Sequence, residues 1–420
     1  MWSEPQQWRR MAQCRTDAAV LGTRVEYEAD LNVAVDAFEP AKSRAHFLQY
    51  PTTMLSTLAS GRTLRIAQVA PLCESVPPRL YGGTERVVSY LTDELVRLGN
   101  DVTLFASGDS HTRAKLVAVR PDALRLSGSG AGADVAAHSL LVERVAQRAA
   151  AFDLIHFHLS DLHLPVARRL DTPSVTTMHG RLDIPELKPL FDEFSEAPLV
   201  SISEAQRMPL PDACWAGTVY HGLPADSFTF QPKSDGYFVF VGRISPEKRV
   251  DRAIAIAEAC GCPIRIAAKI DPVDRAYFDR EIAPLFSRPL VTFVGEIDDA
   301  RKGAFIGGAR ALLFPVDWPE PFGLVMIEAL ACGVPVIAFR AGSVPEIIDH
   351  GLTGFVVDSI EEAVEAARRI DRIDRATCRA VFERRFGVSR MADDYLRIYR
   401  QQIARMGRMT TAHARHAASG

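Results

Sequence analysis

The sequence lacks the features that would assign it to a membrane, a secreted or a nucleic-acid-binding protein. It has no run of about eighteen apolar residues, as a transmembrane helix needs, and its first residues, MWSEPQQWRRMAQC, lack the apolar core of a secretory signal. The formal net charge of −3 leaves no broad basic surface for nucleic acid. We therefore expect a cytoplasmic protein without a nucleic-acid partner, and peripheral contact with a membrane stays open.

The chain also lacks a recognisable set of metal ligands. Its seven cysteines are an odd number, and Cys260 and Cys262 stand only two positions apart, so the spacing is not that of a zinc site. His156 and His158 alternate on an expected strand near His163, but no carboxylate or cysteine completes a ligand set. We expect reduced thiols, as in the cytosol, and no metal site.

Two series of short apolar runs are present, separated by amphipathic segments. The first begins at Leu64 with LRIAQVA, DVTLFA, DLIHFH, PSVTTMH and PLVSIS, and the second with YFVFVGR, PIRIAAK, LVTFVG, ALLFPV, VPVIAF and TGFVV. This alternation is typical of βαβ units in parallel sheets, and 420 residues exceed what one core usually supports. The sequence therefore predicts an α/β protein with two Rossmann-like domains, whose parallel sheets face a central cleft.

The domain boundaries follow from changes in this pattern. Residues 1–60 show no sustained periodicity, and a translational start at Met54, shortly before the first strand, is a hypothesis. The stretch His221–Asp235 is rich in Pro, Gly and Asp and is the expected linker. We expect a poorly ordered leader (1–60), an N-terminal domain (61–222), a C-terminal domain (223–385), a helix returning to the N-terminal domain (386–405) and a flexible tail (406–420).

Two carboxylates flank the expected start of a helix after the strand ALLFPV. We expect the helix to begin near Phe322, so that Glu328 lies almost two turns in and Glu320 precedes the first turn. The free backbone N–H groups at a helix start bind anions such as a diphosphate, and Gly323 lets a ligand approach the backbone. By itself, the spacing also fits a helix whose first turn merely carries favourable acids.

The segment EPFGLVMIEALACGVPVIAF resembles the signature of glycosyltransferase family 4, the large retaining family with the GT-B fold. This resemblance implies that Glu320 faces the donor sugar and that Glu328 binds the ribose hydroxyls of the nucleotide. It also implies that the amides of Phe322, Gly323 and Leu324 meet sugar and phosphate. The N-terminal domain would then bind the acceptor and the C-terminal domain the nucleotide sugar.

Two cations follow the first strand of the second series, in FVGRISPEKRVDRAIAIAE. We expect a helix with Ser245 as its N-cap and Pro246 at its first position, which places Arg243 and Lys248 at the carboxyl end of the strand. GRISPEKR is similar to the family pattern, which implies that both cations stabilise the leaving nucleoside diphosphate without a divalent metal. A solvated basic helix start is the alternative.

A pair of glycines, Gly82 and Gly83, stands before an amphipathic helix near the first strand. Backbone amides at such a turn can approach a charged ligand, and the family's glycine-rich loop lies here, closing on the donor phosphates or the acceptor. A structural turn capped by Thr84 is the alternative. No G-x-G-x-x-G motif with a later acidic residue follows the strand, which disfavours a nicotinamide-dependent dehydrogenase.

Three further positions carry weaker signals. His179 ends the strand PSVTTMH, and the resemblance implies that it touches the donor sugar, although a lone histidine can also be structural. Ser203 and Glu204 resemble an element near the diphosphate or acceptor, and Ser203 can equally be a helix N-cap. Where many relatives carry Asn-Gly-Val-Asp, this chain has His221-Gly222-Leu223-Pro224, which leaves the contact at the hinge open.

Together these motifs predict a retaining hexosyltransferase that moves a sugar from a nucleotide-sugar donor to a hydroxyl of a carbohydrate or other acceptor. The catalytic candidates are Glu320, His179, Arg243 and Lys248, and no metal or cofactor is expected. Two alternatives stay open, namely a nucleotide-sugar-binding regulator without transfer activity, and a phosphorylase or epimerase with the same fold. The donor base, the sugar, the acceptor and the oligomeric state cannot be derived from the motifs.

Overall fold

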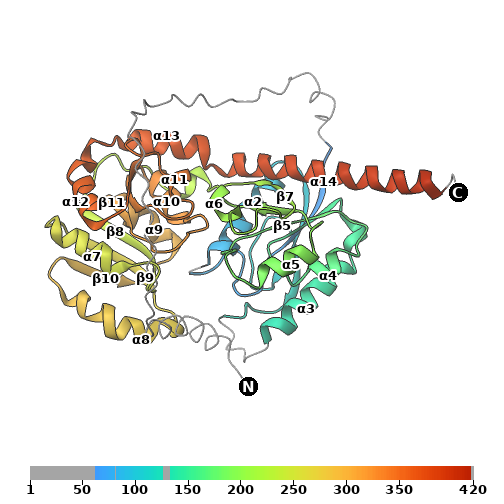
Figure 1. The fold of residues 1–420 in the computed structure, drawn as a ribbon, viewed down its shortest axis with the longest axis horizontal. Helices are drawn as coiled ribbons and strands as arrows, with labels where there is room; N and C mark the ends of the chain where they lie inside the picture. Colours follow the sequence, from blue (N-terminus) through green and yellow to red (C-terminus); the bar gives the residue numbers. More distant parts are fainter. Residues whose placement is uncertain (1–61, 81, 126–132, 418–420) are drawn as a thin grey trace, which may run out of the picture. The chain divides into compact units, whose positions relative to one another are not determined.

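The computed structural model describes residues 62–80, 82–125 and 133–417, with side chains as far as residue 408. The leader expected over residues 1–60 lies outside these ranges. The described residues form two parallel β-sheets with helices on their faces, so the predicted α/β architecture is confirmed (Figure 1).

The first sheet has seven parallel strands in the order β3-β2-β1-β4-β5-β6-β7. They are β1 (Arg65–Val69), β2 (Asp101–Ser107), β3 (Lys115–Arg120), β4 (Leu154–Phe157), β5 (Ser174–Thr177), β6 (Leu199–Ser201) and β7 (Trp215–Thr218). All predicted strands of the first series are present. The edge strands β3 and β7 were not predicted, because neither reads as a run of buried apolar residues; none of their side chains is fully buried.

The second sheet has six parallel strands in the order β10-β9-β8-β11-β12-β13. They are β8 (Tyr237–Arg243), β9 (Ile264–Lys269), β10 (Val291–Gly295), β11 (Ala309–Phe314), β12 (Val336–Phe339) and β13 (Gly354–Val357), all six as predicted. The strand order reverses beside β8, which lies between β9 and β11. The carboxyl ends of β8 and β11 are therefore the expected place for a ligand.

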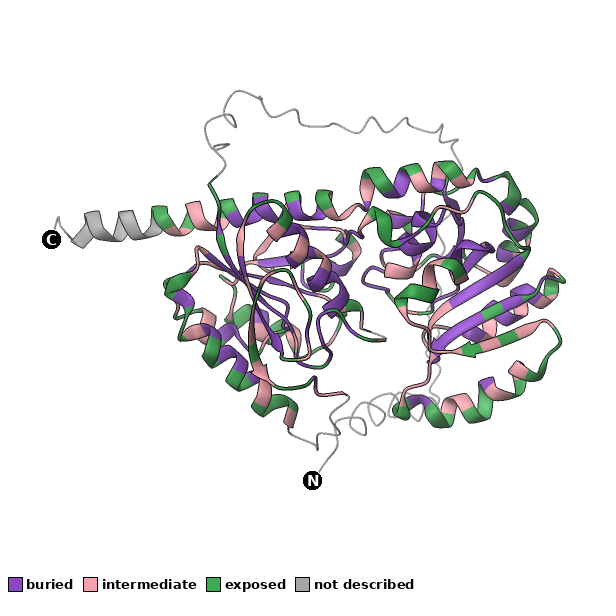
Figure 2. Cartoon of the chain, turned by 180° about the vertical axis from the view of Figure 1, so that it is seen from behind, coloured by how far each residue is buried: buried purple, intermediate pink, exposed green. Residues whose placement is uncertain are grey.

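Helices cover both faces of each sheet, and the buried residues concentrate in the strands (Figure 2). The first lobe has α2 (Gly83–Arg97), α3 (Ala133–Ala146), α4 (Leu164–Ala167), α5 (Leu187–Glu193), α6 (Glu204–Arg207) and the 3-10 turn Ala149–Ala151. The second lobe has α7 (Val250–Ala259), α8 (Arg275–Tyr277), α9 (Asp299–Gly307), α10 (Leu324–Ala331), α11 (Val344–Ile347), α12 (Ile360–Arg369) and α13 (Arg375–Arg385). A π-helical turn, Phe278–Ile282, and the 3-10 turns Ala225–Ser227, Pro272–Asp274, Ala283–Ser287 and Ile370–Arg372 complete it.

The chain returns to the first lobe through the long helix α14 (Val388–Ala417), which lies along α2 (Figure 1). Tyr395 and Tyr399 are fully buried in one core cluster with Ile66 of β1. The helix extends through most of the tail expected at 406–420, because Ala, Met and Arg in that stretch favour helix continuation. None of the helices in the described ranges has the length and apolar character needed to cross a membrane.

The core of the first lobe contains a buried histidine, His163. The ring of His163 stacks on Phe157 at 4.1 Å, and its Nε2 shares a 2.7 Å hydrogen bond with the Thr176 hydroxyl. Burial lowers the pKa of His163 from its ordinary 6.5 to about 3, because a charged ring would lose its hydration. The folded chain therefore keeps this ring neutral where the unfolded chain protonates it.

This difference predicts that stability falls as the pH falls from about 6.5 towards 3. Each proton bound only by the unfolded state contributes a slope of about 1.4 kcal/mol per pH unit. In His163→Gln, the slope of the unfolding free energy between pH 6 and pH 4 should be smaller by about this amount. Urea unfolding at a series of pH values measures it, with the exposed His111→Gln as control. Equal slopes in wild type and His163→Gln would contradict the assignment.

Candidate active site

The two lobes share a cavity of about 490 Å³ at the carboxyl ends of their strands. All the catalytic and donor-binding candidates from the sequence line this cavity, whereas Ser203 and Glu204 do not. The candidates that line it are Gly82, Gly83 and His179 of the first lobe, and Arg243, Lys248, Glu320, Phe322, Gly323, Leu324 and Glu328 of the second. Segments more than two hundred residues apart in the chain thus meet at one place.

The start of α10 lines the second-lobe side of the cavity. Gly323 is its N-cap residue and has a left-handed backbone with φ of +80°, which favours glycine. A Cβ at this position would lie 2.8 Å from Met326 Cε and 3.1 Å from the Phe314 ring, so a larger residue would also displace these two side chains. The helix begins at Leu324, two residues later than expected near Phe322, and Glu328 therefore lies about one turn in rather than almost two.

The loop after β12 holds this segment from the other side. The backbone N–H of Ser343 donates to the carbonyl of Glu320 at 2.9 Å, and its hydroxyl donates to the carbonyl of Phe322 at 2.9 Å. Gly342 has φ of +53°, and a Cβ there would lie 2.3 Å from the Glu320 carbonyl oxygen. These two hydrogen bonds from Ser343 were not predicted. Their signal in the sequence is a Gly-Ser turn shortly after a buried strand.

Lys248 and Glu320 form a largely buried ion pair. Their side chains are only 13% and 10% exposed, so water screens the attraction weakly. Trp318, which the sequence analysis also missed although it stands beside the motif, donates from its indole Nε1 to Glu320 Oε2 at 2.7 Å. The Lys248 ammonium lies 4.9 Å from the centre of the Trp318 ring, a cation–π contact.

Arg243 ends β8 and is held by carboxylates on both sides. Its guanidinium lies 2.8 Å from Glu247 and 3.6 Å from Asp271. The prediction that a helix begins with Ser245 and Pro246 is wrong. These residues form a turn, in which the Lys248 N–H donates to the Ser245 carbonyl at 3.1 Å.

Helix α7 begins only at Val250, after Arg249. The backbone of Arg249 is left-handed, with φ of +54°, and interrupts the helical path. The turn is joined to the loop after β11, because the Asp317 N–H donates to the Glu247 carbonyl at 2.8 Å. This bond fixes the loop after β8, which carries Lys248, against the loop after β11, which carries Glu320.

Glu328 is buried at 2% exposure and pairs with Lys302 of α9 at 2.6 Å. Lys302 Nζ also lies 3.8 Å from Asp299, which forms an ion pair with Arg86 on α2 of the first lobe. A chain of alternating charges thus crosses the cavity from one lobe to the other. Lys302 belongs to no motif and was therefore not predicted as a site residue.

The first-lobe wall begins with the two glycines. Gly82 is the N-cap residue of α2 and Thr84 lies inside the helix, so the alternative of a turn capped by Thr84 is wrong. Next to them, burial and, to a smaller extent, the nearby Glu74 together raise the pKa of the Glu85 carboxyl to about 7. Glu74 also lines the cavity and forms an ion pair with Arg125.

A stack of aromatic rings links the first-lobe wall to α10. His179 follows β5, and its ring stacks on His221 with the centres 5.4 Å apart. The ring of His221 lies at 63° to that of Phe322, with the ring centres 4.8 Å apart. Burial lowers the pKa of His179 to about 3 and that of His221 well below 6.5. Both rings are neutral at physiological pH.

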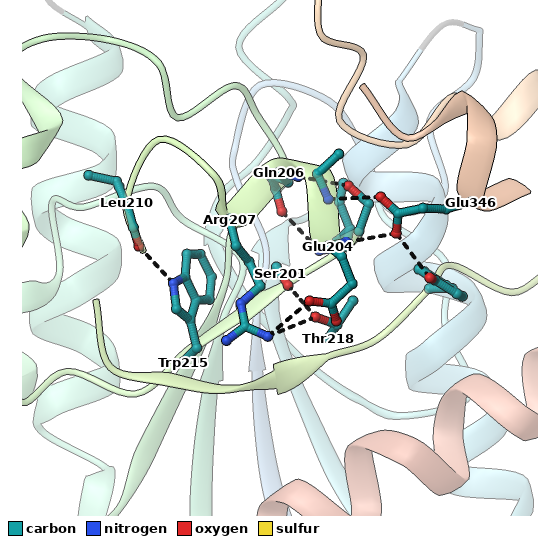
Figure 3. A network of polar contacts seen from close by, with 12 residues as sticks. Ser201, Glu204, Gln206, Arg207, Leu210, Trp215, Thr218 and Glu346 are labelled. Carbon is teal, nitrogen blue, oxygen red and sulfur yellow. Dashed lines mark hydrogen bonds and ion pairs between the residues drawn. The ribbon is translucent and has the colours of Figure 1, made fainter. Parts of the chain in front are cut away.

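Ser203 and Glu204 lie apart from the cavity, and here the alternative interpretation holds. The Ser203 hydroxyl is the N-cap of α6 and accepts from the Gln206 N–H at 3.1 Å. The N–H groups of Glu204 and Ala205 donate to the carboxylate of Glu346, each at 2.8 Å (Figure 3). Because Glu346 belongs to α11 of the second lobe, this contact joins the lobes.

The histidines of LIHFHLSDLH have other partners than a metal. His156 is bonded to Tyr399 and Thr177, and His158 to Gln68 and His179. Elsewhere in the described ranges, Cys73, Asp134 and His138 lie within ligand distance of one another. However, His138 Nε2 accepts from the Leu72 N–H at 3.0 Å and Nδ1 faces Asp134, so the ring offers no lone pair to a metal.

Comparison with known proteins agrees with this geometry. Residues 226–376 match the family model described as glycosyl transferases group 1, and residues 81–208 match the one described as glycosyltransferase family 4. A phosphatidyl-myo-inositol mannosyltransferase of Mycolicibacterium smegmatis is 25% identical over 70% of this chain and 81% of its own length. An uncharacterized 41.2 kDa protein of Klebsiella pneumoniae is 30% identical over 39% of this chain, which spans 45% of that relative.

Solved structures share the fold at low sequence identity. A glycosyltransferase of avilamycin A biosynthesis superimposes on 81% of this chain and 98% of its own, with a TM-score of 0.61 and 24% identity. The sucrose-phosphate synthase of Thermosynechococcus elongatus covers 82% of this chain and 100% of its own, with a TM-score of 0.67 and 20% identity. An Anabaena protein solved with UDP and glucose has a TM-score of 0.61 and 19% identity over 80% of this chain and 98% of its own.

The matched regions fall on both lobes, and the signature segment with Glu320 and Glu328 lies inside one of them. The chain is a glycosyltransferase of family 4 and has the GT-B fold.

Proposed function

We propose that the protein transfers a hexosyl group from a nucleoside diphosphate sugar to a hydroxyl of an acceptor, with retention of anomeric configuration and without a divalent metal. The observation that carries the proposal is the convergence of Arg243, Lys248 and the start of α10 on one cavity. Two fixed cations and free backbone N–H groups match the charge of a departing diphosphate. Structural neighbours solved with UDP and UDP-glucose support a donor of this class.

The ion pairs keep these cations in place before the donor arrives. Arg243 rests against Glu247, and Lys248 against Glu320, in a weakly screened environment. A diphosphate that enters the cavity offers both cations a stronger partner. Because the groups are already oriented, little reorganisation is needed as negative charge develops on the leaving group. Glu320, released from Lys248, is then positioned to accept hydrogen bonds from the sugar hydroxyls.

We assign a front-face reaction to this arrangement. The bond between the sugar C1 and the phosphate oxygen breaks, the acceptor oxygen bonds to C1 on the same face, and the acceptor proton passes to the departing phosphate oxygen. Covalent attack by Glu320 is less suitable, because Trp318 still holds its carboxylate and hydrogen bonds from the sugar hydroxyls suit its position better. Closure of the lobes would exclude the water that otherwise hydrolyses the donor. The acceptor, a carbohydrate or another hydroxyl compound, would lie against the first-lobe wall.

Two other functions fit the same fold. A regulator that binds nucleotide sugars without transferring them has no need for both cations beside an acid, so the intact set argues against it. A phosphorylase would require inorganic phosphate, and an epimerase would isomerise its substrate without an acceptor. We also place the reaction in the cytoplasm, with contact to a membrane surface limited to peripheral binding if the acceptor is a lipid.

Removing either cation should slow transfer. In Arg243→Ala and Lys248→Ala, kcat is expected to fall roughly a hundredfold, as loss of a charge-stabilising group typically does. Release of the nucleoside diphosphate measures the rate. Arg252→Ala is the matched control, because Arg252 lies on the neighbouring helix α7 and pairs with Asp317 outside the cavity. Unchanged rates in both test variants would remove the assignment.

The role of Glu328 can be separated from that of the phosphate site. In Glu328→Gln, UDP-, GDP- or ADP-sugars should stabilise the protein less than they stabilise wild type, because a ribose contact is lost. Inorganic pyrophosphate lacks the ribose and should bind both proteins equally. Thermal shift in the presence of EDTA measures this, since saturating ligand at 100 times Kd stabilises by about 2.7 kcal/mol. If Glu328→Gln lost as much stabilisation by pyrophosphate as by the nucleotide sugar, the ribose contact would be contradicted. Binding that requires a divalent metal would also count against the proposal.

A further inference from the structure

A continuous chain of buried hydrogen bonds runs from the cavity to the C-terminal helix. His179 Nε2 lies 2.9 Å from His158 Nδ1, and His158 Nε2 lies 2.7 Å from Gln68 Oε1. Gln68 Nε2 donates to the Tyr399 hydroxyl of α14 at 3.1 Å. The side chains of Gln68 and Tyr399 are fully buried and His158 is 3% exposed, so these groups are bonded to one another rather than to bulk water.

The orientation of the Gln68 amide sets the direction of these hydrogen bonds. Gln68 Nε2 lies 3.1 Å from the Tyr399 hydroxyl, and Gln68 Oε1 lies 2.7 Å from His158 Nε2. The NH₂ group of Gln68 therefore faces Tyr399, and its carbonyl oxygen faces His158. A carbonyl only accepts, so His158 must donate from Nε2. Tyr399 in turn donates its proton to His156 Nδ1 at 2.7 Å.

The same logic carries through to the cavity. Burial lowers the pKa of His158 well below 6.5 and that of His179 to about 3, so each neutral ring carries one proton. With its proton on Nε2, His158 presents a bare Nδ1, and His179 must donate to it from Nε2. The remaining nitrogen of His179, Nδ1, is then an unprotonated acceptor, which is buried and has no partner among the described residues.

We propose that Gln68, His158 and Tyr399 are positioning residues that hold His179 in the Nε2–H tautomer, so that His179 meets the substrate as a hydrogen-bond acceptor. This inference rests on the proposed function only because it takes the substrate to be a sugar. A sugar hydroxyl can donate a hydrogen bond to His179 Nδ1, whereas an ionised carboxylate of a ligand cannot, because it has no proton to donate. The C-terminal helix thereby takes part in the site through Tyr399, although it does not line the cavity.

The tautomer can be measured without any substrate. In protein labelled with ¹⁵N-histidine, the ring signals of His158 and His179 are assigned by comparison with His158→Gln and His179→Gln. Two-bond ¹H–¹⁵N correlations then report which nitrogen is protonated. We expect a protonated Nε2 and a bare Nδ1 in both rings at pH 7. A protonated Nδ1 in either ring of the wild-type protein would overturn the proposal, whatever reaction the protein catalyses.

Kinetics then test whether this matters for transfer. Tyr399→Phe removes the group that orients Gln68, and we expect a mixture of tautomers at His179 and a kcat lowered roughly tenfold, with KM for the donor changed less. Tyr395→Phe is the matched control, because this hydroxyl lies one turn away on α14 and bonds to Thr177 at 2.9 Å rather than to Gln68, His158 or His179. The Tyr395→Phe variant should retain the wild-type tautomer of His179 and the wild-type kcat.

Gln68→Met provides a second variant, and thermal unfolding confirms that each variant is folded. A shifted tautomer with unchanged kcat would refute the positioning role, as would equal losses of kcat in Tyr399→Phe and Tyr395→Phe. Absence of transfer by the wild-type protein with every donor would count against the proposed function and leave the tautomer result to decide the present one.

Discussion

The ion pair between Lys248 and Glu320 is the contact on which the geometry of the site depends. It joins the loops that follow β8 and β11, neighbouring parallel strands whose carboxyl ends meet at one edge of the sheet. The Asp317 N–H bond to Glu247 ties the same two loops through the backbone. Together they place an ammonium group, an acid and a helix start around one space.

Such an arrangement is costly to build, and the surrounding structure compensates. Buried charges lose hydration, so Glu320 is satisfied by both Lys248 and Trp318, and Glu328 by Lys302. Gly323 and Gly342 accept left-handed backbone conformations where a side chain would clash. In the first lobe, the buried rings of His158 and His179 stay neutral and are held by shared hydrogen bonds. Polar groups that are oriented before binding are well suited to stabilise charge that appears only during reaction.

The sequence predicted the parts of the molecule that follow local patterns. The buried strands of both sheets were recognisable as apolar runs, and the motif residues lie together because parallel strands end at one edge. Other features arise from contacts between distant segments, for which no local pattern exists. Lys302 reaches Glu328 from another helix, Glu346 reaches α6 from the other lobe, and Tyr399 reaches Gln68 from the opposite end of the chain. The start of α7 was misplaced because Arg249 adopts a left-handed conformation that its residue type does not favour.

The central claim concerns where a diphosphate binds, and a crystal structure with a bound nucleoside diphosphate, grown in EDTA, tests it most directly. The account predicts phosphate oxygens within hydrogen-bonding distance of the Arg243 guanidinium, the Lys248 ammonium and the backbone N–H groups at the start of α10, with Glu320 released from Lys248. A diphosphate bound elsewhere, or one held only through a divalent cation, would contradict it.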